Sequence, residues 1–140
     1  MNENVNVENM NENKDFDLGD YLNQNSGDRY FVGKTMSLNK QWRVKVLSYE
    51  GVKEKEFPDG KRFIPYLKVQ PVEIAIDSKF LGDKYCIEAG KQYLLAVNRS
   101  NAQFLKDNGI KSFKDLIGKN LIGITTMTPK GNGLIFTEIK

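Results

Sequence analysis

Apolar and polar positions alternate with a period of two in QWRVKVLSY, residues 41–49, as expected of a half-buried strand. The core-facing positions are Trp42, Val44 and Val46. The solvent-facing positions are Arg43, Lys45 and Tyr49. We therefore predict a strand here, with Trp42 in the core.

The charged run EGVKEKEFPDGKR follows and contains the turn signal Pro58-Asp59-Gly60, so it is predicted to be a mobile hairpin loop. Residues 62–76 are strand-like but contain Pro65 and Pro71. Because proline cannot donate to a ladder, this strand is predicted to be an edge, bulged or broken. One face is predicted to carry Phe63, Leu67 and Val69, and the other Arg62, Ile64, Tyr66 and Lys68.

One helix is predicted, at about residues 99–108, after a strong strand at residues 91–98. Ser100 and Gln103 have the spacing of a capping box, and Gly109 is placed to end the helix in a left-handed turn. A second, shorter turn has the same signals at Ser112, Asp115 and Gly118. Two further strands are predicted, at residues 120–128 and 134–139, joined by PKGNG; residues 77–90 have no assignable form.

Charge is distributed unevenly along the 140 residues. Residues 1–28 contain seven acids and one base, a net charge of −6, so the total of +3 leaves +9 on residues 29–140. The asparagine-rich start has little to bury, and we expect residues 1–28 to be a disordered acidic tail. Residues 29–140 are expected to form one domain, whose positive charge suggests a polyanionic partner.

The tail contains the segment DFDLGDYL, in which apolar side chains are set among acids. The apolar residues are Phe16, Leu18, Tyr21 and Leu22. They are candidates for binding a protein partner or the basic groove of the same chain; the alternatives are a nonspecific tail segment or a strap over the core.

Chemistry-bearing motifs are sparse. The chain has no histidine and one cysteine, Cys86, so a zinc site, an internal disulfide and a cysteine nucleophile are not expected. The run SGDRYFVGKT places five residues between Gly27 and Gly33 where a phosphate-binding loop has four. We expect no enzymatic activity, no cofactor and no metal. No membrane span or signal peptide is expected, and the single cysteine favours an intracellular, cytoplasmic location.

The element order is a mainly β pattern with a single short helix between the third and fourth strands. This order is typical of the OB arrangement, a five-stranded Greek-key barrel in which the helix caps one end. Residues 91–139 also resemble small OB-fold proteins of phages, archaeal viruses and prokaryotes. The matching residues are Asn98, Ser100, Asn101, Leu105, Gly109, Leu116, Ile117, Gly118 and Lys119. The sequence departs from their usual pattern at Arg99 and Ser100. The resemblance implies binding of single-stranded nucleic acid in replication, recombination or repair.

A sequence-tolerant binder needs cations along the phosphates and flat side chains on which bases stack. In OB proteins the ligand crosses strands 2 and 3 between two loops. The candidate nucleic-acid-binding residues are Arg43, Lys45, Tyr49, Lys53, Lys55, Lys61, Arg62, Phe63, Tyr66, Lys68 and Lys130. Nearby Glu50, Glu54 and Glu56 dilute the charge of the first loop. Single-stranded DNA or RNA is the expected partner; the alternative is an OB-like subunit whose sheet face meets another protein.

Overall fold

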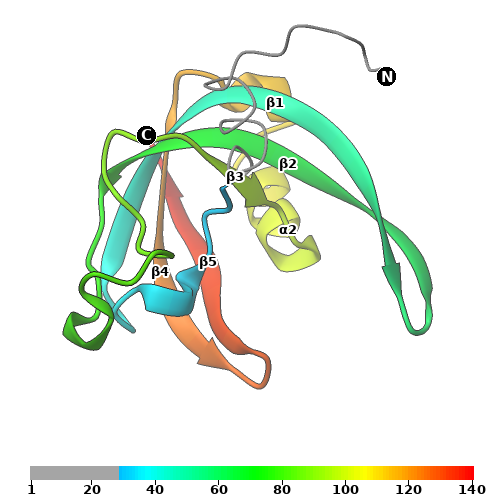
Figure 1. Cartoon of the computed structure of the whole chain (residues 1–140). Coiled ribbons are helices and arrows are strands. Elements are labelled where there is room, and N and C mark those ends of the chain that lie inside the picture. The colour runs from blue at the N-terminus through cyan, green and yellow to red at the C-terminus, as the bar shows by residue number, and fades with distance from the viewer. Residues whose placement is uncertain (1–28) are drawn as a thin grey trace, which may run out of the picture.

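The computed structural model describes residues 29–140 and has a five-stranded, fully antiparallel sheet with the strand order β3-β2-β1-β4-β5 (Figure 1). The strands are β1 (Gln41–Phe57), β2 (Gly60–Glu73), β3 (Tyr93–Ala96), β4 (Asn120–Thr128) and β5 (Gly131–Ile139). The only α-helix within these residues is α2 (Arg99–Asp107), and the 3-10 turns are η1 (Gly33–Thr35), η2 (Ser78–Phe80) and η3 (Phe113–Leu116). The prediction of a mainly β domain with one helix between the third and fourth strands is confirmed. The predicted tail motif at Phe16, Leu18, Tyr21 and Leu22 lies outside the described residues.

The alternation of the first strand places its apolar residues in the core, as predicted. Trp42, Val44 and Val46 are fully buried. The Trp42 ring makes edge contacts with Phe31 and Phe136, with ring centroids 5.2 and 6.0 Å apart. Gly123 lies opposite Trp42 in β4, and a Cβ there would fall within 2.8 Å of the indole Cη2. The core therefore depends on a residue without a side chain at this position.

The two prolines of β2 lie where the pairing with β1 is irregular. Pro65 is paired with Val52 and Pro71 with Val44, each beside a register shift. Their carbonyls still accept hydrogen bonds from Val97 and Gly90. The strand is bulged, as one of the predicted alternatives had it, but it is not an edge, because β2 lies between β1 and β3.

The predicted loop after residue 49 is instead a continuation of the ladder. The pairing of β1 with β2 runs to Phe57 and Gly60, so only Pro58 and Asp59 form the turn. Residues 52–64 project from the body as a two-stranded arm, which Figure 1 shows at the right. The alternating Lys-Glu run is compatible with a strand because each side chain reaches solvent on one side or the other.

The N-cap of α2 lies two residues before the residue that the sequence predicted. Asn98, rather than Ser100, is the N-cap, and its side chain accepts from the backbone N–H of Asn101 at 2.8 Å. Gly109 has φ +85°, the left-handed conformation predicted for the end of the helix. The capping box of η3 at Ser112 and Asp115 is also confirmed.

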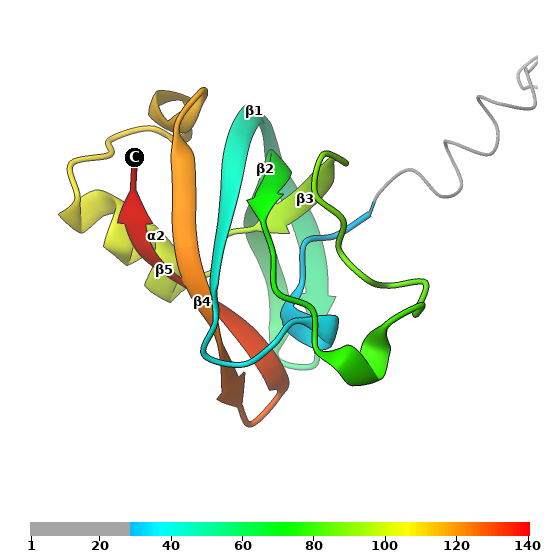
Figure 2. The same ribbon diagram turned by 90° about the vertical axis from the view of Figure 1, so that its left-hand side faces the viewer.

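Residues 29–36 lie between the two end strands of the sheet. Phe31 donates to the Leu94 carbonyl of β3 at 2.8 Å, and Leu94 donates to Arg29 at 2.7 Å. On the other side, the Asn132 side chain of β5 donates to the Gly33 carbonyl at 3.0 Å. Figure 2 shows this segment, in blue, passing beside β3 and leading into η1. The segment therefore satisfies backbone polar groups of β3 that an end strand otherwise leaves unpaired.

The helix α2 lies against β5 and bonds to its backbone through Asn101. Asn101 is 3% exposed, donates from Nδ2 to the Leu134 carbonyl at 3.0 Å and accepts from the Phe136 N–H at 3.0 Å. One side chain thus mimics a neighbouring strand along the edge of β5. Met127 on β4 is 68% exposed. Within residues 29–140, no helix is long and apolar enough to cross a membrane.

Candidate functional site

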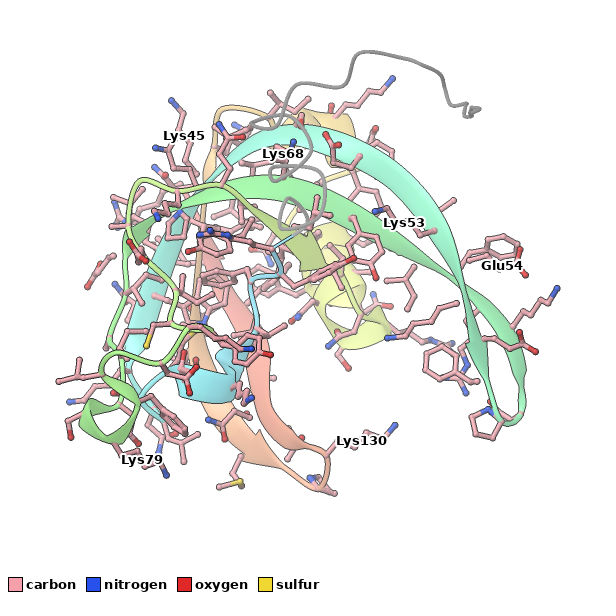
Figure 3. All side chains as sticks on the ribbon, viewed as in Figure 1. Lys45, Lys53, Glu54, Lys68, Lys79 and Lys130 are labelled. Atoms are coloured by element: carbon pink, nitrogen blue, oxygen red, sulfur yellow. The ribbon has the colours of Figure 1, made fainter. Side chains whose placement is uncertain are left out.

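The charges of the arm are sorted onto two faces by its strand pairing. Opposed residues of an antiparallel pair share a face, and successive residues alternate between faces. Lys53 is opposite Ile64 and Lys55 is opposite Arg62, so these cations share one face. Glu54 is opposite Phe63, and Glu56 is opposite Lys61, on the other. The glutamates therefore do not dilute the lysines as the linear sequence suggested. Figure 3 shows Lys53 and Glu54 pointing to different sides of the arm.

The basic face of the arm continues into a groove with a volume of about 820 Å³. Its walls come from four parts of the chain: residues 30–33, the arm at residues 53–55, the β2–β3 pair, and β5. The lining residues from the sheet are Tyr66, Leu94, Ala96, Asn132 and Leu134. The groove is named here the tyrosine groove, because Tyr30 and Tyr85 also line it.

The three tyrosines of the groove differ in how much ring they present. Tyr66 is only 8% exposed, because the Tyr30 ring packs against it with centroids 6.0 Å apart. Tyr30 and Tyr85 are 44% and 52% exposed. The accessible flat surfaces therefore belong to Tyr30 and Tyr85, while Tyr66 acts as the support beneath Tyr30.

Lysine ammonium groups lie close to these rings. Lys53 Nζ is 5.3 Å from the centroid of Tyr66, and Lys34 and Lys84 are 4.4 and 5.0 Å from that of Tyr85. These distances fall within the range of cation–π contacts. Cations and aromatic faces therefore occur together in the groove, although they come from segments far apart in the sequence.

Several of the predicted residues lie on the same face of the sheet as Tyr66 but outside the tyrosine groove. Arg43, Lys45 and Lys68 lie on the outer face with Tyr66, as the pairing of Lys45 with Gln70 and Ser48 with Lys68 shows. Figure 3 places Lys45 and Lys68 near the top of the sheet, away from the end of the arm. Arg43 is half-buried, and its Nε has no hydrogen-bond partner. These three residues extend the basic surface beyond the groove without lining it.

Three of the predicted binding residues lie on the opposite face from Tyr66. For Phe63 this is the predicted face, which it shares with Leu67, whereas the outward orientation predicted for Tyr49 is wrong. Tyr49 stacks on Phe113, with centroids 5.2 Å apart, because the register shift after Val46 turns it inward. Phe63 is 68% exposed but lies on the acidic face of the arm. Lys61 shares that face and pairs with Glu54 at 3.1 Å.

Arg62 is held at the turn of the arm. Its guanidinium donates to Asp59 at 2.6 Å, and this bond and its charge lower the pKa of the Asp59 carboxyl. Lys130 adds a smaller effect on the same pKa. Lys130 is in the turn between β4 and β5, and Figure 3 shows it at the tip of that hairpin. Lys130 therefore lies near the turn of the arm, where Arg62 is neutralised by Asp59.

Sequence reasoning missed Tyr30, Lys34, Lys84 and Tyr85. Each occurs in a basic–aromatic run, DRYFVGKT or GDKYC, of the kind that drew attention on the strands. Tyr30 and Tyr85 line the groove, and Lys34 and Lys84 lie against the Tyr85 ring. The positions of Lys84 and Tyr85 depend on the path of residues 77–90, for which the sequence offers no periodicity.

Among residues 29–140, no group of three or more His, Cys, Asp and Glu side chains gathers closely enough to hold a metal ion. No family model, curated protein or solved structure matches the chain.

Proposed function

We propose that this protein is a non-catalytic single-stranded nucleic-acid-binding protein and that the polynucleotide lies in the tyrosine groove. The proposal rests on one observation: Tyr30 and Tyr85, both exposed, line the same groove as the lysine-bearing face of the arm. A role in replication, recombination or repair follows from the resemblance to small OB-fold proteins.

The proposal includes an OB-type barrel. The strand order and the position of α2 support this proposal, because in this fold β3 and β5 would approach one another. In this protein residues 29–36 occupy the space between them through bonds to Leu94 and Asn132. We infer that this segment serves as the closing element of the barrel and at the same time carries Tyr30 into the binding face.

Base stacking and phosphate neutralisation would both contribute to the free energy of binding. A stacked base contributes about 1–3 kcal/mol, and it requires an accessible ring face, which Tyr30 and Tyr85 offer. Lys53, Lys55 and Lys130 flank the groove and would displace counterions from the phosphates. Affinity should therefore fall steeply with salt while showing little dependence on base sequence.

The test is a fluorescence titration with a labelled single strand of about 20 nucleotides at about 50 and 200 mM salt. We expect saturable binding that weakens at the higher salt, and a loss of about 5- to 100-fold on Tyr30→Ala or Tyr85→Ala. Lys79→Ala is the matched control, because Lys79 is an exposed lysine on η2, far from the groove. Absence of saturable binding at low salt would refute the proposal and favour a protein-interaction subunit.

The sorting of charges on the arm permits a sharper comparison. Lys55→Ala and Glu56→Ala change neighbouring exposed residues on opposite faces, and Glu56 does not line the groove. If the polynucleotide follows the basic face, Lys55→Ala weakens binding and reduces the salt dependence by about one phosphate contact. Glu56→Ala should leave both nearly unchanged. Equal effects of the two variants would mean that net charge, rather than this face, governs binding.

A further inference from the structure

The acidic face of the arm has an apolar centre that nothing in the described chain covers. Phe63 is 68% exposed and Val52 is 56% exposed. Both lie on the side of the sheet that is continuous with the core, because Leu67, Pro65 and Phe63 alternate along β2 and oppose Tyr49, Val52 and Glu54. Large apolar side chains grouped in this way are typical of an interaction surface.

This apolar surface extends from the arm toward the end of α2. Tyr49, one pair further along the same sheet face than Val52, borders a second groove with a volume of about 760 Å³. Ile110 and Phe113 line that groove, and Phe113 stacks on Tyr49. Together these five residues, Val52, Phe63, Tyr49, Ile110 and Phe113, form what we name the apolar strip.

The two ends of the apolar strip carry opposite charge. At the arm end lie Glu54 and Glu56, offset by Lys61, for a net charge of −1. At the helix end, Lys106 and Lys111 line the groove and contribute +2. The strip is thus apolar in the middle, acidic at one end and basic at the other. Such a surface is complementary to the same surface of a second copy that is rotated by 180° about an axis through its middle.

We propose that the apolar strip is a dimer interface for a second copy of this chain, related by a two-fold axis through the middle of the strip. In such an isologous contact each copy presents the same patch, so the acidic end of one strip meets the basic end of the other twice. Phe63 of each copy would reach toward the groove beside Ile110 and Phe113 of its partner. Like-charge contact in the parallel arrangement would disfavour that alternative.

The interface leaves the tyrosine groove accessible. The strip is on the acidic face of the arm, whereas Lys53 and Lys55 on the basic face line the groove; of the residues on the acidic face, Glu54 alone also lines it. The dimer would therefore present two nucleic-acid-binding grooves. The inference does not depend on the proposed function, because self-association is measurable without any nucleic acid.

The first experiment is sedimentation velocity of the full chain between about 1 μM and 1 mM protein. A reversible dimer is expected, and Phe63→Asp should weaken it by about 30-fold or more, as for a buried aromatic anchor. Met127→Asp, which changes an equally exposed apolar residue at a site away from the strip, should leave it unchanged. A wild-type protein that stays monomeric over this range would overturn the proposal, as would an equal effect of the two variants.

Charge reversal tests the two-fold arrangement. Glu54→Lys with Glu56→Lys changes the arm end from −1 to +3, and Lys106→Glu with Lys111→Glu changes the groove end from +2 to −2. Each double variant alone should dimerise less than wild type, because its two ends then carry the same sign.

Mixing the two double variants should restore dimers, since every end then meets its opposite. Far-UV circular dichroism checks that each variant is folded. Recovery of dimers in the mixture requires that both variants are folded. Recovery in the mixture is the expected result. If each variant weakens the dimer and the mixture does not recover, the two ends do not meet and the arrangement is wrong.

Discussion

Asn101 is the residue on which the attachment of α2 to β5 depends most directly. We predict that Asn101→Ala lowers the free energy of unfolding by about 2–4 kcal/mol. The variant removes both bonds to β5, and the Phe136 N–H is left buried without its partner, at a cost of about 1–3 kcal/mol. Leu134 is half-buried at the edge of the tyrosine groove, so the loss of the bond to its carbonyl adds only about 1 kcal/mol.

The assay is urea unfolding followed by tryptophan fluorescence, since Trp42 is the only tryptophan and is fully buried. A loss of this size should also lower Tm by about 10 °C. Gln103→Ala is the control, because Gln103 is on the same helix but exposed, and its change should stay within about 0.5 kcal/mol. A loss below about 1 kcal/mol for Asn101→Ala, with an unchanged m-value, would refute the reasoning.

Asn101→Asp refines this prediction through pH. The new carboxylate can still accept from Phe136, but its other oxygen faces the Leu134 carbonyl in a buried place, so its pKa in the folded state should be raised. A carboxyl with a raised folded-state pKa binds its proton more tightly when folded, and the deficit relative to wild type therefore shrinks as pH falls through that pKa. A deficit that is constant between pH 7 and pH 4 would contradict this assignment.

Three further predictions concern other parts of the molecule. Gly123→Ala should destabilise the fold by about 3 kcal/mol in urea unfolding, because the added Cβ meets the Trp42 ring and the β5 backbone. Arg62→Ala should raise the pKa of Asp59 toward its ordinary value in an NMR titration; the Asp59–Arg62 bond operates above that pKa and is lost as pH falls through it. Deleting residues 1–28, which carry a net charge of −6, should tighten nucleic-acid binding if the tail competes for the groove, and unchanged affinity would remove that role.

Local sequence signals determined most of the secondary structure. The alternation around Trp42 placed a strand and its buried face correctly, and Gly109 and the Ser112 capping box marked where short helical segments end or begin. These features depend on contacts within a few residues, so they are present in the linear pattern. The cap at Asn98 was missed because two polar residues close together both have the chemistry of a cap.

Register and the composition of the groove were decided by the tertiary structure. A single irregularity after Val46 turns Tyr49 from the outer face to the inner one, since a shift of one residue exchanges the two faces of a strand. The pairing of the arm, which the sequence showed only as mixed charge, separates Lys53 and Lys55 from Glu54.

The positions of Tyr30 and Tyr85 beside the arm likewise depend on the tertiary structure. Tyr30 comes from a segment held against β3, and Tyr85 from a connection without regular structure. The sequence by itself therefore determined which segments are strands and helix, because hydrophobic period and capping are local. Only the tertiary structure decided which aromatic and basic side chains meet, because that depends on pairing between residues distant along the chain.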